Sequence, residues 1–102
     1  MSITNTTLST VISNVYVSSG NTVISAAYFC NFGANTNAFT VYAVPTGSTA
    51  STNNIIYNTI QLASGDTYVM DWEKLVLGNG DSLRANAVGN ISITATISYI
   101  GV

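Results

Sequence analysis

The sequence predicts an all-β fold, an antiparallel β-sandwich of jelly-roll or immunoglobulin-like type with about eight strands. Along residues 91–99, Ile, Ala and Tyr alternate with Ser and Thr, as in a strand with one buried and one wet face. Gly, Asn, Asp, Ser and Pro separate the apolar runs at the short intervals typical of antiparallel sheets. No stretch has the apolar spacing of an amphipathic helix.

We expect a strand wherever an apolar or alternating run lies between two turn signals. The first such run, 8–17, places Val11, Val15 and Val17 on one side. The run 39–44 begins a Phe-Thr-Val-Tyr alternation, and 91–100 has the clearest alternation of all. In chain order, the expected strands are 8–17, 22–32, 36–44, 55–62, 66–72, 74–77, 82–88 and 91–100.

The turns before three of these strands share one pattern, a Gly followed by Asn or Asp and then by Thr or Ser. The three copies are Gly20-Asn21-Thr22, Gly65-Asp66-Thr67 and Gly80-Asp81-Ser82. Gly permits the turn, and the following side chain can hydrogen-bond backbone amides, so the pattern predicts a strand-entry turn. Gly89-Asn90 suits a two-residue hairpin, and the polar loop 45–54 is the longest expected connection.

The chain is short enough to form one domain, residues 1–102. Residues 1–7 are rich in Thr and Asn, and they are either an ordered N-terminal arm that adds a strand to a neighbour's sheet or a frayed terminus. The sequence has neither a signal peptide nor an apolar run of membrane-spanning length. We therefore expect synthesis in the cytoplasm and no membrane partner.

The composition provides few groups for catalysis or for binding charged partners. The chain has no histidine, one cysteine, two cationic and four anionic side chains, and a formal net charge of -2. Without imidazole, Ser-His-Asp, Cys-His and His-metal sites are excluded. Lys74 and Arg84 cannot neutralise the several phosphates that nucleic-acid binding requires. We expect a protein that is not an enzyme, with no cofactor and no nucleic-acid partner.

The acidic residues raise two further alternatives, a calcium site and a pair of glycosidase carboxylates. The spacing of the acids does not resemble a calcium loop, so turn chemistry is the favoured interpretation. Asp71 and Glu73 share one strand face near Asp81. Lys74 and Arg84 lie close in sequence, and pairing with them at the surface is the simpler interpretation. We therefore assign neither catalytic nor metal-binding residues.

The expected strand 22–32 is apolar on both faces. Phe29 falls on one face, and Tyr28, Cys30 and Phe32 fall on the other. Two apolar faces indicate either a central strand with a covered exterior or a contact between subunits. Cys30 has no partner for an intramolecular disulfide, and its apolar neighbours predict a buried structural thiol.

Aromatic and C-terminal apolar residues are candidates for a protein interface. Tyr68, Met70 and Trp72 lie on one face of a single expected strand, where such a row is a core stripe, an interface patch or a sugar-stacking platform. Ile100 and Val102 are apolar at the end of the last strand. The candidate interface residues are Tyr42, Tyr57, Tyr68, Trp72, Ile100 and Val102.

Four segments and the closing strand 88–99 resemble small single-domain β-sandwich virion proteins of tailed bacteriophages. The segments are VSSGNTV at 17–23, AFTVYAVP at 38–45, IQLASGDT at 60–67 and LVLGNGDSL at 75–83. The resemblance covers nearly the whole chain, although its motifs largely describe turns. The chain departs from the family where Ser18-Ser19-Gly20 replaces the family's Pro-Ala-Gly turn, and Gly supplies the required backbone angle in either case.

The resemblance implies a capsid decoration or cement protein, located in the virion and bound to the particle surface in many copies. Its partners would be phage capsid or tail proteins, and it would be a homo-oligomer or a lattice component. A tail, neck or baseplate accessory protein is the first alternative. A carbohydrate-binding module, with Trp72 and exposed tyrosines as stacking platforms, is the second.

Overall fold

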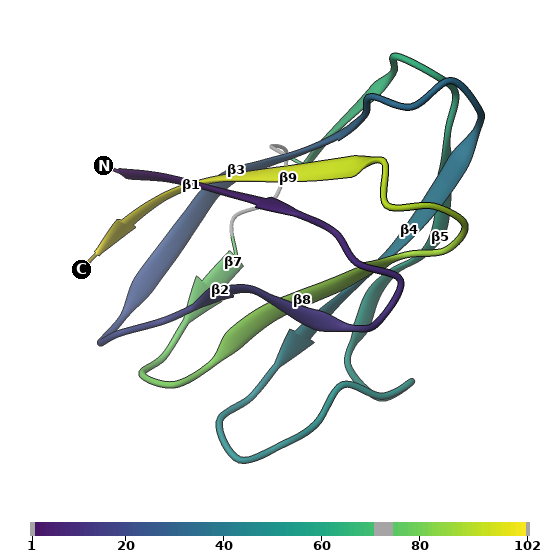
Figure 1. The fold of residues 1–102 in the computed structure, drawn as a ribbon. Helices are drawn as coiled ribbons and strands as arrows, with labels where there is room; N and C mark the ends of the chain where they lie inside the picture. Colours follow the sequence, from purple (N-terminus) through teal and green to yellow (C-terminus); the bar gives the residue numbers. More distant parts are fainter. Residues whose placement is uncertain (1, 71–74, 102) are drawn as a thin grey trace.

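The computed structural model describes residues 2–70 and 75–101, which contain nine β-strands in two antiparallel sheets (Figure 1). The strands are β1 (Ser2–Thr7), β2 (Ser13–Val17), β3 (Thr22–Asn31), β4 (Asn37–Val44), β5 (Ile55–Leu62), β6 (Thr67–Met70), β7 (Leu75–Leu77), β8 (Ser82–Ala87) and β9 (Ile93–Gly101). Sheet I has the strand order β1-β9-β3-β6, with β7 also paired to β3, and sheet II has the order β2-β8-β4-β5. The predicted antiparallel sandwich is confirmed.

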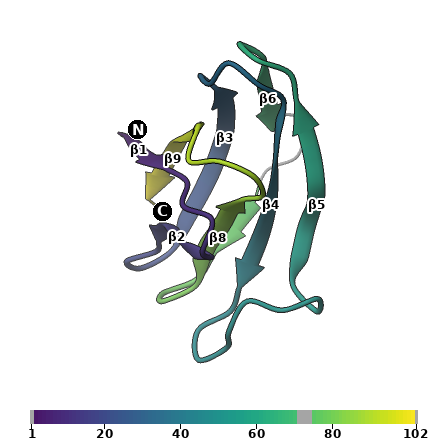
Figure 2. The same ribbon diagram turned by 45° about the vertical axis from the view of Figure 1, so that its right-hand side comes forward.

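β6 and β7 lie along the same side of β3 and act as one interrupted edge strand. β6 pairs with residues 27–30 of β3, and β7 pairs with residues 22–24. When β6 and β7 are counted together, the chain crosses to the other sheet at every connection except the one between β4 and β5, which lie side by side (Figure 2). This is jelly-roll connectivity. An immunoglobulin-like sandwich pairs its first two strands within one sheet, whereas β1 pairs here with β9.

The core lies between the sheets and is filled by the inward-facing half of each alternating strand. Phe29 of sheet I and Phe39 of sheet II stack with their ring centroids 4.5 Å apart. On one side, the cross-strand neighbours of these two rings are Ala95 and Ala87, respectively, so small side chains leave room for large ones there. Burial of each phenylalanine contributes about 1.5–3 kcal/mol. This packing holds the two sheets in register with one another.

The N-terminal region differs from the sequence-based expectation. The predicted strand 8–17 is wrong in its first half, because Leu8 is buried and residues 9–12 form a connection before β2. Residues 2–7 form β1, which pairs antiparallel with β9, so the chain's own sheet takes up this segment. The alternation of β2 is broken by an irregularity between Asn14 and Tyr16, and Val17 is exposed while Val15 is buried.

The connections gather at two opposite ends of the sandwich (Figure 1). The four-loop end, on the right and upper right of Figure 1, contains the connections 8–12, 32–36, 63–66 and 88–92. The three-loop end, toward the lower left and bottom of Figure 1, contains the connections 18–21, 45–54 and 78–81.

The predicted turns are partly confirmed. Gly20, Gly65 and Gly80 adopt φ values of 73°, 80° and 85°, a region that disfavours residues with a Cβ atom. The hairpin predicted at Gly89-Asn90 is wrong, because β8 and β9 belong to different sheets and residues 88–92 cross between them. A turn signal marks a change of direction, and it does not say whether the next strand joins the same sheet.

Candidate interaction surfaces

The carboxylate of Asp81 is fully engaged within the three-loop end. One carboxylate oxygen accepts hydrogen bonds from Thr46 N at 2.9 Å and Thr46 Oγ1 at 3.1 Å, and the other accepts from Gly78 N at 2.8 Å. The backbone hydrogen bonds from Thr46 and Gly78 hold the pKa of Asp81 below its ordinary value of 3.8. Asp81 is therefore an ionised clasp between the 45–54 and 78–81 connections. The predicted hydrogen bonds to amides just beyond the turn differ from those observed, because the backbone donors belong to Gly78, before Asp81, and to Thr46 in another connection.

The remaining reactive groups do not converge on a site in the described part of the chain. Residues 2–70 and 75–101 contain no group of three or more His, Cys, Asp or Glu side chains that could hold a metal ion. Asp71 and Glu73, the pair considered for glycosidase chemistry, lie outside the described residues, as does Lys74. Cys30 is half-buried on the outer face of sheet I, so its thiol is less buried than predicted.

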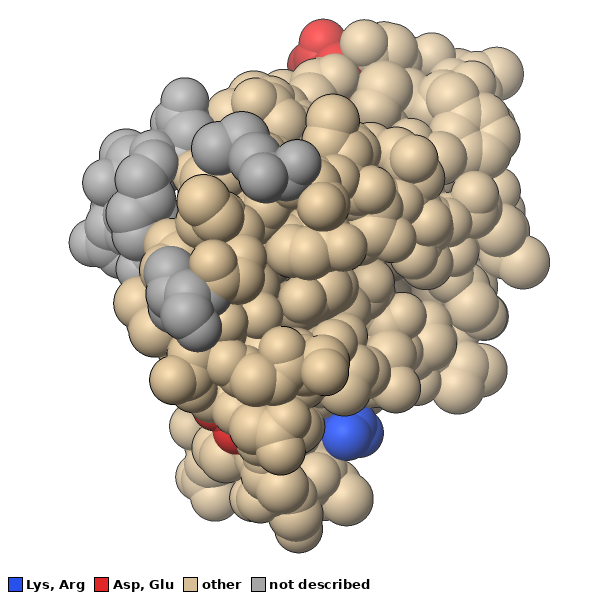
Figure 3. All heavy atoms as spheres, turned by 90° about the vertical axis from the view of Figure 1, so that its left-hand side faces the viewer, with Lys and Arg blue, Asp and Glu red and all other residues tan. Residues whose placement is uncertain are grey.

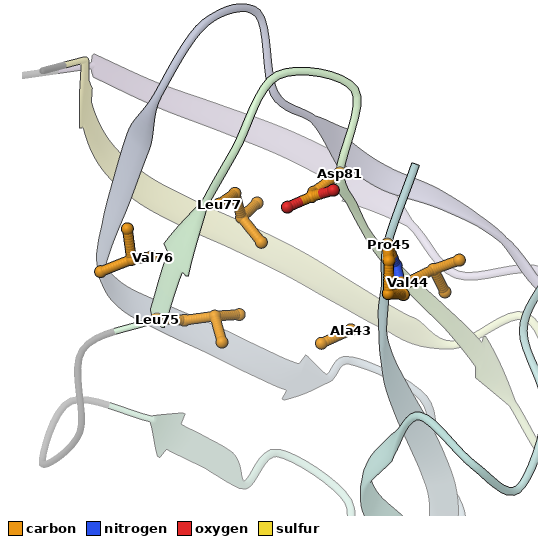
Figure 4. A pocket seen from close by; sticks show the side chains of 7 residues that line it. All are labelled: Ala43, Val44, Pro45, Leu75, Val76, Leu77 and Asp81. Atoms are coloured by element: carbon orange, nitrogen blue, oxygen red, sulfur yellow. The ribbon is translucent and has the colours of Figure 1, made fainter. Parts of the chain in front are cut away.

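A small hollow opens between the two sheets where β7 faces the end of β4 (Figure 4). It has a volume of about 130 Å³, and its lining is apolar except for Asp81 at one end. The lining residues are Ala43, Val44, Pro45, Leu75, Val76, Leu77 and Asp81. Because the Asp81 oxygens already accept hydrogen bonds from the protein, the hollow offers no uncommitted polar group among these side chains.

A second hollow, of about 430 Å³, is formed by the long 45–54 connection itself. Its lining contains no aromatic side chain on which a sugar ring could stack. The lining residues are Pro45, Gly47, Ser48, Thr49, Ser51, Asn53 and Asn54.

The outer face of sheet I carries an exposed apolar surface, which we call the apolar sheet face. Cross-strand pairing places Val23 beside both Ile100 of β9 and Val76 of β7, and it places Tyr28 beside Val69 of β6. Val76 is 67% exposed and Val23 is half-buried. The apolar sheet face consists of Ile3, Val23, Tyr28, Val69, Val76 and Ile100.

No charged side chain belongs to the five strands of sheet I as the structure describes them. The rest of its outer face is lined by hydroxyl and amide groups, including Asn5, whose Nδ2 donates a 2.9 Å hydrogen bond to Thr96 Oγ1. Figure 3 views the molecule from the left of Figure 1; on this side, charged atoms of the described residues are visible at the top and in the lower part. An uncharged apolar surface of this kind is typical of a protein interface.

A second exposed apolar surface lies at the four-loop end, and we call it the apolar loop cluster. It is displayed by three connections, and its members range from 38% exposed for Ile12 to 71% exposed for Val11. Ala87 N donates to Ser9 O, and Phe32 N donates to Ser92 O, so backbone hydrogen bonds connect these loops. The apolar loop cluster consists of Val11, Ile12, Phe32, Val88 and Ile91.

A buried polar network fixes the loops beneath this cluster. Asn37 Nδ2 donates to Ser92 Oγ and to Asn90 O, at 3.0 and 2.7 Å. Ser92 Oγ in turn donates to Asn31 Oδ1 at 3.0 Å, which connects β3, β4 and the 88–92 connection. Asn37 Oδ1 accepts a 2.9 Å hydrogen bond from Gly89 N. Since buried amides are costly to leave unpaired, this network holds the loops in one arrangement.

The structure separates the six candidate interface residues. Ile100 belongs to the apolar sheet face, and Tyr42 is half-buried on sheet II beside Arg84. Tyr57 and Tyr68 are half-buried, pack against the core and meet edge to face with centroids 5.4 Å apart. Their strand parity aligns them with the inward-facing Val41 and Phe29, respectively. Trp72 and Val102 lie outside the described residues.

The sequence-based candidates missed the apolar loop cluster. A signal was present, because Phe32 and Val88 each directly precede a glycine of a turn, where a large apolar side chain has no strand to bury it. Ile91 was misleading, since it continues the alternation of β9 although β9 begins at Ile93. Ile91 is instead 62% exposed.

The described part of the chain contains no helix with the length and hydropathy needed to cross a membrane. Comparison of the chain with protein-family models, with curated proteins and with solved structures finds no match.

Proposed function

We propose that the protein is a non-enzymatic structural subunit of a tailed-bacteriophage particle, bound to the particle surface in many copies as a capsid decoration or cement protein. The observation that carries the proposal is the presence of two separate exposed apolar surfaces on one small domain. The apolar sheet face covers one broad side, and the apolar loop cluster occupies one end. A subunit needs at least two different contacts to join an extended assembly.

The apolar loop cluster is the surface that we assign to the particle. Side chains such as Phe32 and Ile91 project from loops at the end of the sandwich, so they suit a concave, apolar site on a capsid or tail protein. The network of Asn31, Asn37 and Ser92 fixes these loops before binding, which reduces the entropy lost on docking. Each copy can bind weakly, because contacts repeated around the particle act together.

The environment of the Asp81 carboxylate supports a binding role over catalysis. Asp81 is engaged in hydrogen bonds within the fold, and the hollow beside it is small and apolar. The carbohydrate-binding alternative ranks below the virion proposal, since Tyr57 and Tyr68 pack on the core and the 45–54 hollow lacks an aromatic platform.

The test is sedimentation of the labelled protein with separated heads and tails of the phage that carries the gene, each stripped of the protein. We expect saturable binding to heads at a copy number set by the capsid lattice. Phe32→Ser should weaken this binding at least tenfold, and Val17→Ser, an apolar-to-polar change outside both surfaces, should leave it unchanged. Binding to tails alone would favour the accessory alternative, and binding to neither fraction would contradict the proposal.

A further inference from the structure

We infer that two copies of this chain pair back to back through the apolar sheet face, so that sheet I of one copy packs on sheet I of the other. This pairing is a property of the isolated chain and does not depend on the particle contact proposed above. Its occupant is a second copy, and the chemistry of the face itself identifies it.

The first argument is charge. The strands of sheet I, as far as the structure describes them, carry no charged side chain, while the chain as a whole carries six charges, two cationic and four anionic. Two identical charged surfaces repel, or they bury unpaired ions at a cost of several kcal/mol. Between the described residues of two such faces, neither penalty arises; Asp71, Glu73 and Lys74 lie outside the described residues.

The second argument is hydrogen bonding. The polar groups on the face are hydroxyls and one amide, including Thr7, Thr67, Thr94 and Thr96. A hydroxyl both donates and accepts, so across a two-fold axis it can pair with its own copy. A face that combined ammonium groups or carboxylates with apolar residues would instead need a partner of different chemistry.

The third argument is area. At about 4.8 Å between strands and about 3.3 Å per residue, the described strands of sheet I give a face of roughly 500 Å², or about 1,000 Å² for two copies. This is about the area that a specific interface needs, so a weak and reversible dimer is expected. Sheets stack face to face with a spacing of about 10 Å, which brings Val23, Val76 and Ile100 within reach of the opposite copy.

The experiment is sedimentation equilibrium of the purified protein over a concentration series from micromolar to millimolar. We expect the mean mass to rise from 10.7 kDa toward twice that value. Val76→Lys places a charge in the face and should weaken the dimer at least tenfold. Val17→Lys makes the same change at an exposed strand position on the outer side of sheet II and should have no effect.

Two further measurements keep the test decisive. Circular dichroism shows whether Val76→Lys folds. If it does not, the substitute variant is Ile3→Lys on β1, because Ile3 is 67% exposed at the opposite edge of the face. Cys30, the single cysteine, lies on this face, so its reaction with a thiol reagent should slow as wild-type concentration rises and stay constant in the lysine variant. A protein that stays monomeric throughout, or equal weakening by Val17→Lys, would overturn the inference.

Discussion

The two ends of the sandwich are held together by different chemistry. At the four-loop end, the neutral side chains of Asn31, Asn37 and Ser92 form a buried network. At the three-loop end, the ionised carboxylate of Asp81 joins two connections at the surface, and Thr46 Oγ1 also donates a 2.7 Å hydrogen bond to Asn79 O. The first arrangement is protected from water, and the second is open to it.

The two ends also differ in the exposed apolar side chains that they carry. The four-loop end presents the apolar loop cluster, whereas none of the exposed large apolar side chains lies in the three connections of the other end, 18–21, 45–54 and 78–81. Exposed apolar residues on loops bind well only if the loops are already ordered, because ordering them during binding costs affinity. The buried network therefore serves the surface above it as well as the stability of the fold.

The largest expected difference between the ends comes from removing one asparagine at each. Asn37→Ala leaves Asn90 O and Gly89 N without their partner inside the protein and should lower the free energy of unfolding by about 2–4 kcal/mol. Asn54→Ala also removes hydrogen bonds, from Ser51 N and to Thr49 O, but water replaces them at the surface, so the loss should stay below about 1 kcal/mol. Urea unfolding measures both values, and equal losses would contradict the comparison.

The sequence predicted the features of the fold that depend on neighbouring residues, and it did not predict the contacts between residues far apart in the chain. Alternation in 93–99 and glycine at positions 20, 65 and 80 are local signals, and they correctly predicted a strand and three turns. The contact between Asn37 and Ser92 joins residues 55 positions apart, and only the jelly-roll connectivity brings them together. For the same reason β1, rich in Thr and Asn, could not be placed until its partner β9 was known.

The candidate surfaces show the same limit. The two-sided apolarity of β3 indicated either a covered exterior or a contact between subunits, and its outer residues Val23 and Tyr28 form part of the exposed apolar sheet face. Tyrosine is a residue type that is common at interfaces, but the pairing of Tyr68 opposite Phe29 turns its side chain toward the core. Residue type indicated what a side chain could do, and strand parity together with sheet position decided which side it faces.

A smaller, pH-dependent difference should appear in Asp81→Asn. The pKa of Asp81 is lowered in the folded protein by hydrogen bonds from Thr46 and Gly78, so the folded state favours the charged form. Its stabilisation is present above the ordinary value of 3.8 and is lost as the pH falls through the lower folded value. Thermal melts should therefore separate wild type from the variant at pH 7, and the separation should shrink as the pH falls below 3.8.

Asp66→Asn, in a turn of the four-loop end, makes the same change in net charge and serves as the control for Asp81→Asn. A separation between wild type and Asp81→Asn that stays unchanged as the pH falls below 3.8 would show that the clasp does not depend on the carboxylate charge.

The smallest effect on stability is expected for the exposed valines. Val88 in the apolar loop cluster and Val17 outside it are 52% and 50% exposed, so Val88→Ser and Val17→Ser remove similar side chains from similar surroundings. Each should change the free energy of unfolding by less than about 0.5 kcal/mol. Chemical denaturation checks this, and a loss above about 1.5 kcal/mol for Val88→Ser would mean that the cluster stabilises the fold itself.

The most direct test of the account is amide hydrogen exchange of the protein bound to the phage particle that we propose as its partner, compared with the free protein. The account predicts slower exchange in the connections 8–12, 32–36 and 88–92 of the four-loop end, with 45–54 and 78–81 unchanged. Protection confined to the three-loop end, or no change at either end, would contradict the assignment of the apolar loop cluster as the docking surface.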